Sequence, residues 1–417
     1  MQVSLHRTGH KLGLLAAAGF ACAFFVFANV RPWLAERAAA GMDRPTLERA
    51  VALEPQNALH HYRLGRFSYF VEQDPDRAEA HYRRAVSLNP SFAYGWFDLA
   101  AVYRFRGDFE SEQEALENAL EADPRNPEVA WYAANFFLAR GETDRAHPLI
   151  RAVLWSDEQK LQPALALCWR ATHDARRIAS EALPQSDRYY SAFIDYVLRE
   201  HEPAAADTVW GVWMESGIAT DAKLALRYID HLISQNQITA ARRAWGELSQ
   251  LASDLTKRSQ PGNLIVNGGF EWEILGGGFE WRYQRTPLAQ LEIDSSTFRS
   301  GSRSLKIDFV GDSGDDIGLS QLIAVEPDTR YAFSALVRTE EIRSIGRPRF
   351  AIHDAASGNL LFFSEELSGT LPWTERGGVF TTGPHTALVS LRLVRDGRSL
   401  IRGRAWIDDL TLRRVQP

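Results

Sequence analysis

The sequence predicts a multidomain fold in which an α-helical solenoid is followed by an all-β sandwich of the jelly-roll type, with a transmembrane helix ahead of both. Three observations predict it: an uncharged apolar run at residues 12–30, apolar residues at helical spacing up to residue 258, and short alternating strands after residue 260. The period changes at Gln260, Pro261 and Gly262. We therefore divide the chain into residues 1–31, 32–258 and 261–417.

The overall composition is that of an ordinary globular protein, with 417 residues, 45% hydrophobic and 24% charged. The formal net charge of -6 is spread along the chain without a dense field of either sign, which argues against nucleic-acid binding. The two cysteines, Cys22 and Cys168, lie in the apolar run and in a helical stretch, so we expect no disulfide framework.

The apolar run at residues 12–30 contains no charged side chain and follows Arg7 and Lys11. At ~1.5 Å per residue a helix of this length crosses a bilayer core of ~30 Å. We expect an uncleaved membrane anchor. A cleaved signal peptide is the alternative, because Val26 and Ala28 are residue types that a signal peptidase accepts.

The sequence gives conflicting signals for the orientation of this anchor in the membrane. Four arginines on its C-terminal side weigh against export of the chain: Arg31, Arg37, Arg44 and Arg49. Against them stand the very short basic N-terminal tail and the character of the C-terminal module described below. We expect the bulk of the protein on the periplasmic or extracytoplasmic side, or secreted if the segment is cleaved.

The helical part contains a repeat. The segments AVALEP, AVSLNP and ALEADP begin at residues 50, 85 and 119, a period of 34 to 35 residues that is typical of helix-turn-helix solenoids. The pattern inside residues 93–126 resembles the tetratricopeptide repeat, through Trp96, Leu99, Ala100, Tyr103, Gly107, Ala119 and Pro124. The resemblance covers residues 44–154.

Residues 155–258 are interpreted as degenerate repeats that extend the solenoid. Helices are expected at 187–199, 203–215, 221–234 and 239–251, separated by Gly217 and Asn236 as breakers. Three tryptophans of this region are expected to be core residues, namely Trp210, Trp213 and Trp245.

The resemblance implies a concave groove lined by the first helix of each repeat. It places Tyr62, Phe97 and Trp131 at equivalent positions, as an aromatic stripe that would bind a protein partner. Three polar residues fall on the same face: Arg66, Arg104 and Asn135. The alternative is that the three rings pack one repeat against the next.

The β part begins with NGGFE at 267–271 and ends with IDDL at 407–410, with strands expected at 304–309, 318–325, 331–338, 349–353 and 388–394. These two motifs, the turn and strand RSGSRSLKI at 299–307, and Trp373 ahead of a strand at 380–382 resemble carbohydrate-binding modules with a galactose-binding-like jelly roll. The resemblance spans nearly all of residues 261–417. It specifies the fold better than the ligand.

The same resemblance implies a structural calcium ion that ties the first strand to the last. Glu271, Asp408 or Asp409, with backbone carbonyls near residues 300–302, would supply hard oxygen ligands. The alternative is that these carboxylates accept hydrogen bonds only.

Sugar recognition would require exposed aromatic faces. The candidates are Trp272, Phe279, Trp281, Tyr283 and Phe362. Trp373 and Trp406 are expected to be packing residues instead.

No catalytic motif is found: the sequence has no glycine-rich phosphate loop, no Gly-x-Ser-x-Gly, no His-Glu-x-x-His and no pair of CxxC units. A carboxylate pair acting on a glycosidic bond is left open by sequence. We expect a non-enzymatic, membrane-anchored envelope scaffold whose repeats bind a protein and whose β-sandwich binds polysaccharide, in exopolysaccharide or surface-glycan assembly or export. The alternatives are a purely structural assembly factor without sugar binding and an unrecognised glycan-processing enzyme.

Overall fold

The structure is a computed structural model that describes residues 8–41, 43–311, 314–396 and 399–415. Arg7, which precedes the apolar run, lies outside the described residues. The chain divides into two compact units, Met1–His173 with Glu181–Pro184 and Asp174–Ser180 with Gln185–Pro417. Each unit is described by itself.

The first unit begins with a nearly continuous helical rod, composed of α1 (Thr8–Phe25), a π-helical turn (Val26–Val30) and α2 (Arg31–Ala39). Its apolar side chains are open to the surroundings, and Phe20 is 76% exposed. Among the described residues, this rod is the one helix long and apolar enough to cross a membrane, a test that a signal sequence passes as well.

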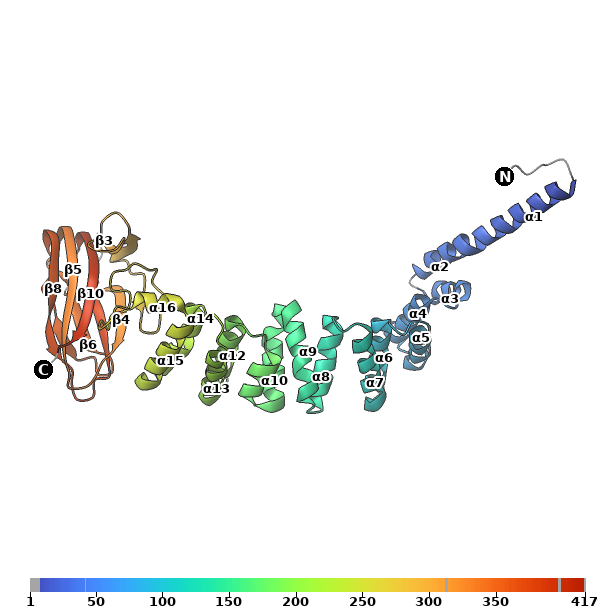
Figure 1. Ribbon diagram of the computed structural model, residues 1–417, viewed down its shortest axis with the longest axis horizontal. Helices are drawn as coiled ribbons and strands as arrows, with labels where there is room; N and C mark the ends of the chain where they lie inside the picture. Colours follow the sequence, from blue (N-terminus) through green and yellow to red (C-terminus); the bar gives the residue numbers. More distant parts are fainter. Residues whose placement is uncertain (1–7, 42, 312–313, 397–398, 416–417) are drawn as a thin grey trace. The chain divides into compact units, whose positions relative to one another are not determined.

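The repeats of the first unit are antiparallel helix pairs (Figure 1). Asp74 and Asp108 begin the second helices by accepting backbone N–H bonds from residues three positions on. Gly65 allows a close crossing, since a Cβ there would lie 2.8 Å from the Tyr82 ring. The helices are α3 (Arg44–Leu53), α4 (Ala58–Phe70), α5 (Pro75–Leu88), α6 (Ala93–Arg106), α7 (Phe109–Ala122), α8 (Pro127–Ala139), α9 (Thr143–Ser156), a 3₁₀ turn (Glu158–Lys160) and α10 (Leu161–Thr172).

The second unit continues with helices and then the β-sandwich. Its four longer helices match the predicted ranges to within one residue, and Trp210 and Trp213 are buried as predicted. Trp245 is half-buried and lies against the β part. The helical elements are α11 (Ala175–Arg177), a π-helical turn (Ile178–Ala182), α12 (Asp187–Arg199), α13 (Pro203–Glu215), α14 (Ala222–Ser234), α15 (Ile238–Leu251) and α16 (Ser253–Arg258).

The β part is a sandwich of two five-stranded sheets, ordered β1-β4-β9-β6-β7 and β2-β3-β10-β5-β8, in which every recorded pairing is antiparallel. Alternate side chains of both sheets form one core around Phe270, Trp281, Phe333 and Phe350. The strands are β1 (Trp281–Tyr283), β2 (Ala289–Asp294), β3 (Ser304–Val310), β4 (Asp316–Ala324), β5 (Arg330–Arg343), β6 (Pro348–Asp354), β7 (Leu360–Phe363), β8 (Gly369–Thr381), β9 (Leu388–Arg395) and β10 (Arg402–Arg414).

The first segment of the sandwich is tied to its last strand. The Leu264 amide donates to the Leu412 carbonyl at 2.9 Å, and the Leu410 amide donates to the Gly268 carbonyl at 2.9 Å. A Cβ at Gly268 would lie 2.3 Å from the Leu410 oxygen, so only glycine fits there.

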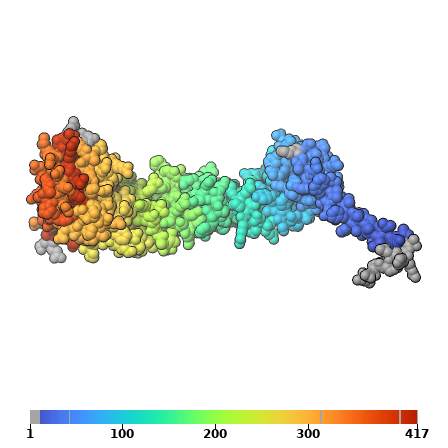
Figure 2. Space-filling view, turned by 90° about the horizontal axis from the view of Figure 1, so that it is seen from above, coloured from blue at the N-terminus to red at the C-terminus, as the bar shows by residue number. Residues whose placement is uncertain are grey.

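The loop at residues 271–280 packs against α14 and α15, and we call this contact the joint. The Gly278 amide donates to Asp230 Oδ1 at 2.8 Å, and Arg282 pairs with the same carboxylate. The Trp245 and Phe279 rings meet edge to face with centroids 5.8 Å apart. Figure 2 shows the yellow helical end and the orange start of the sandwich in continuous contact.

A buried ion pair lies at the centre of the joint. Glu280 is 0% exposed, and its Oε1 lies 3.6 Å from Nη1 of the buried Arg258 on α16. The carboxylate also accepts hydrogen bonds from the Leu275 amide at 2.7 Å and from Asn267 Nδ2 at 2.9 Å. Burial raises the pKa of Glu280 to about 7, while these donors and the Arg258 charge act in the opposite direction.

This pKa shift predicts a pH dependence of stability. Because the pKa of Glu280 is raised on folding, the folded state holds this proton more tightly than the unfolded chain. The stabilisation is therefore complete below the ordinary pKa and is lost as the pH rises to about 7. Relative to Glu280→Gln, the wild type should lose on the order of 2–3 kcal/mol of unfolding free energy between about pH 5 and about pH 8. Urea unfolding monitored by tryptophan fluorescence measures this difference.

Glu273→Gln is the matched control, because Glu273 lies in the same loop with its side chain 76% exposed. It should keep the pH dependence of the wild type. Parallel pH curves for the wild type and Glu280→Gln would show that Glu280 does not titrate in this range.

Candidate functional site

The predicted aromatic stripe lies between successive repeats. Tyr62 on α4 contacts Phe92 edge to face with ring centroids 4.8 Å apart, and Phe97 on α6 contacts Tyr132 on α8 at 5.2 Å. Trp131 lies 5.4 Å from Lys160 Nζ. All three rings are half-buried, so each takes part in packing and still presents surface.

The predicted polar residues of this face contact the same aromatic layer. The Arg66 guanidinium lies 5.8 Å from the Tyr62 ring centroid, and its Nε lies 3.7 Å from Asp98 Oδ2. Arg104 lies 5.1 Å over the Tyr132 ring. Asn135 donates to the Trp131 carbonyl within α8, at 2.7 Å. The two arginines therefore keep donors for a ligand, whereas the Asn135 amide serves its own helix.

The predicted carboxylates converge on the turn at residues 299–303. Glu271 Oε1 accepts from the Ser302 and Arg303 amides at 2.9 and 3.2 Å, and Oε2 accepts from Ser302 Oγ at 2.7 Å. Gly301 has a φ of 64°, in the left-handed region that favours glycine, and lies against the Glu271 carboxylate. These hydrogen bonds tie the start of the sandwich to the turn.

Two aspartates of β10 hold the other side of the turn. Asp408 is buried, and its Oδ2 accepts from the Arg299 and Ser300 amides at 2.8 and 3.1 Å. Burial raises the pKa of Asp408 to about 6. Asp409 Oδ1 accepts from Ser300 Oγ at 2.6 Å; Asp409 lies within the irregularity of β10 between Asp408 and Thr411 and has a φ of 49°.

The structure shows these carboxylates bonded to donors of the protein itself. Calcium takes about six to eight oxygen ligands, whereas the oxygens of Glu271 and Asp408 face N–H and O–H donors of the turn. Within the described residues, no group of three or more histidine, cysteine, aspartate or glutamate side chains is placed to hold a metal. Calcium stays a prediction of the resemblance, and the contacts shown form a clamp without metal.

Melting curves distinguish a calcium site from a clamp made of hydrogen bonds alone. Glu271→Ala removes the acceptor of three hydrogen bonds and should lower the unfolding free energy by about 1–3 kcal/mol, equally in calcium and in chelator. Glu273→Ala, which removes an exposed neighbour, should leave it nearly unchanged. A wild-type melting temperature that falls in chelator, with no such fall in Glu271→Ala, would support the calcium ion instead.

The prediction of exposed sugar-binding rings is wrong for Phe279 and Trp281. They are 6% and 1% exposed. Phe279 packs on Trp245 in the joint, and Trp281 packs on Phe270 in the sandwich core while its Nε1 donates to the Asn267 carbonyl. Burying these large rings offsets the entropy lost on ordering the loop.

Phe362 also packs inward, which corrects its assignment as a sugar ligand. It pairs in register with the fully buried Ile352 and contacts the Phe333 ring at 5.8 Å. The next residue, Phe363, is the exposed ring of β7, and Arg349 stacks on it at 3.8 Å.

The remaining tryptophans divide between the joint and the sheets. Trp272 is half-buried with the Arg258 guanidinium 5.5 Å from its ring, so it belongs to the joint. Trp406 is buried as expected and donates to Asp294 Oδ2 at 2.7 Å, whereas Trp373 is only half-buried on β8.

Tyr283 lies at a cavity. Two hollows of about 330 and 460 Å³ share Tyr283, Leu291 and Glu292 at the open edge of the sandwich, where β1 and β2 face each other. We call them together the edge cleft. Its polar lining includes Arg285, Thr286, Gln290, Glu292 and Asp308.

Neither these polar residues nor the residues of the joint were predicted from the sequence. No strand was expected at β1 or β2, and the arrangement that brings the two strands to one edge depends on pairing with strands distant in the chain. For the joint a signal was present: Gly276, Gly277 and Gly278 in succession indicate close backbone approach. A Cβ at Gly277 would lie 2.6 Å from Asp230, and one at Gly278 would lie 2.4 Å from Trp245.

Comparison with known proteins identifies both parts of the chain. A family model described as a carbohydrate binding domain matches residues 262–394, and one described as a tetratricopeptide repeat matches residues 93–126.

Solved structures resemble separate parts of the chain. It is 23% identical to the MamA protein over 28% of this chain, spanning 64% of that one, with a TM-score of 0.25. A tetratricopeptide repeat protein from Parabacteroides merdae is 15% identical over 50% of this chain and 84% of its own, with a TM-score of 0.29. TmCBM61 in complex with β-1,4-galactotriose is 21% identical over 38% of this chain and 100% of its own, with a TM-score of 0.28.

The helical part is thus a set of stacked helix pairs in which a tetratricopeptide repeat is matched, and the C-terminal part is an antiparallel sandwich matched as a carbohydrate-binding domain. The chain therefore combines tetratricopeptide repeats with a C-terminal domain of the carbohydrate-binding-module type.

Proposed function

We propose that this protein is a membrane-anchored, non-enzymatic adaptor of the bacterial envelope, which binds a protein through its repeats and a polysaccharide through its sandwich. Both matched domain types are non-catalytic. A role beside the machinery that assembles or exports an exopolysaccharide or surface glycan is the concrete form of this proposal.

The edge cleft carries the sugar-binding half of the proposal. It presents an aromatic ring, Tyr283, beside charged and amide side chains, the combination that sugar faces and hydroxyls require. Thr286 Oγ1 is buried and has no hydrogen-bond partner among the described residues. Lys306 lies 2.6 Å from Glu292 and 2.9 Å from Asp308, so it fixes two acceptors at the rim.

Removing the ring of the cleft should abolish most sugar binding. We predict that Tyr283→Ala weakens binding to a responsive polysaccharide by about tenfold or more, because an aromatic anchor in a contact contributes at least ~1.4 kcal/mol. Affinity electrophoresis of the full-length protein in detergent, against a panel of soluble polysaccharides, measures the change.

Phe298→Ala is the matched control, because Phe298 is a 40% exposed ring of the same domain that does not line the cleft. It should bind like the wild type. Equal weakening by both variants would mean that the cleft is not the sugar site. No retardation of the wild type by any polysaccharide would favour the purely structural assembly factor.

The anchor half of the proposal rests on the apolar stretch at residues 12–30 of the rod, whose side chains are exposed. We predict that the protein stays with membranes through carbonate extraction and that protease reaches the repeats only from the non-cytoplasmic side. Protease added to intact and to permeabilised spheroplasts tests the orientation. Digestion of the repeats from the cytoplasmic side alone would remove the envelope assignment.

The repeats supply the protein-binding half. Tyr62, Phe97 and Trp131 keep exposed area on one face, and Arg66 and Arg104 stand beside them with free donors for a carboxylate. An extended or helical segment with acidic and apolar residues suits such a surface.

A further inference from the structure

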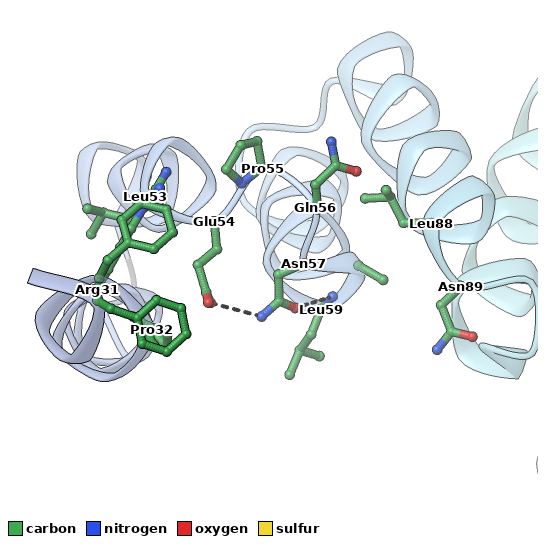
Figure 3. Close-up of a pocket in the computed structure, with 14 residues that line it drawn as sticks. Arg31, Pro32, Leu53, Glu54, Pro55, Gln56, Asn57, Leu59, Leu88 and Asn89 are labelled. Atoms are coloured by element: carbon green, nitrogen blue, oxygen red, sulfur yellow. Dashed lines mark hydrogen bonds between the residues drawn. The ribbon is translucent and has the colours of Figure 1, made fainter. Parts of the chain in front are cut away.

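A pocket of about 930 Å³ lies where the apolar rod meets the first repeat (Figure 3). One wall comes from the π-helical turn of the rod and the residues beside it, with Phe24, Phe27, Arg31 and Pro32. The other wall comes from the turn between α3 and α4 and from the end of α5, with Leu53, Glu54, Gln56, Asn57, Leu59, Leu88 and Asn89.

The two walls are held together by contacts of α2. Ala35 is fully buried, and Glu36 Oε1 lies 2.9 Å from Arg63 Nη1 on α4. The end of the rod is therefore fixed over the first repeat, and the pocket does not depend on a ligand to form.

The lining of the pocket changes from apolar to polar along the chain direction of the rod. Phe24 and Phe27 are each 63% exposed and belong to the apolar stretch that would lie in the bilayer. Arg31 follows one turn later, with its guanidinium 5.1 Å from the Phe27 ring, and the asparagine and glutamine side chains of the repeat lie opposite. Such a gradient matches the boundary between acyl chains and headgroups.

The pocket holds one charge of each sign. Arg31 makes no ion pair with any described residue. Glu54 Oε2 is engaged by Asn57 Nδ2 at 3.1 Å and by His60 Nε2 at 2.9 Å, whereas none of the residues seen in the structure donates to Oε1. A cation donor and a free carboxylate oxygen thus line the same hollow.

We propose that this pocket binds one phospholipid with an amine headgroup, of the phosphatidylethanolamine type. Arg31 would bind the phosphate, Glu54 Oε1 would accept from the ammonium, and the Phe24 and Phe27 rings would pack on the upper acyl chains. This inference rests on the proposed membrane anchor.

Membrane lipid is favoured over a polypeptide as the occupant because the pocket opens on the rod's apolar stretch. If that stretch spans the bilayer, lipid lies against Phe24 and Phe27 at all times. A partner segment would have to displace it and would need to bring its own paired charges.

The test is retention of lipid by the full-length protein. The wild type and the variants are reconstituted in bilayers that contain equal amounts of phosphatidylethanolamine and phosphatidylglycerol. Each protein is then extracted in detergent, and native mass spectrometry measures the mass of the lipid that stays bound. The wild type should retain one phosphatidylethanolamine. Arg31→Gln should reduce retention about tenfold, since hydrogen bonds between charged groups are the strong ones. Glu54→Gln, which keeps an acceptor for Asn57 and His60, should retain both lipids equally.

Arg37→Gln is the matched control, because Arg37 is an exposed arginine of the same short helix that does not line the pocket. It should retain lipid like the wild type. Equal retention by the wild type and Arg31→Gln, or a polypeptide found in the pocket by cross-linking, would overturn the proposal. Carbonate extraction distinguishes failure of the lipid pocket from failure of the membrane anchor. If the protein stays with membranes but retains no lipid, only the lipid pocket is refuted. If carbonate extracts the protein from membranes, the anchor is refuted.

Discussion

The buried contact between Glu280 and Arg258 is the constraint on which the arrangement of the second unit depends. A carboxylate removed from water is costly unless charges and donors surround it, so the chain must bring Arg258, Asn267 and Leu275 to one point. Arg258 comes from the last helix, Asn267 from the first segment of the sandwich, and Leu275 from the loop that follows this segment. Satisfying one carboxylate therefore fixes the sandwich against the repeats, and it explains why helices and strands share a single compact unit.

The same loop shapes the edge cleft. Glu273, Ile274 and Gly276 line one of its hollows, and the Glu273 carbonyl accepts from Arg258 Nη1 at 2.7 Å. A ligand in the cleft would thus lie against a wall that is held in place by α16. Under the proposed function, a glycan in the cleft would lie against a loop that is hydrogen-bonded to α16.

Periodic features of this protein were predictable from sequence, and non-periodic ones were not. The 34-to-35-residue recurrence and the alternation in β3 or β9 report local geometry that each segment carries by itself. The burial of Phe279 and Trp281 depends on which surface each ring meets, and they were named as sugar ligands only because sugar recognition needs exposed aromatic faces. Glu271, Asp408 and Asp409 meet at the turn at residues 299–303, and the donors that face them were visible only in three dimensions. Their role as calcium ligands stays a prediction.

The tie between residues 263–268 and β10 has a consequence for synthesis. Asn263 Nδ2 donates to the Leu410 carbonyl, and the Leu412 amide donates to Asn263 Oδ1, across separations of 147 and 149 residues. The repeats consist of local contacts and can fold as they leave the ribosome or the translocation channel. The segment at residues 263–268 gains its partner strand only when β10 emerges. Until then β3 and β5 also lack the strand that lies between them, so the nascent chain exposes unpaired strand edges that favour aggregation.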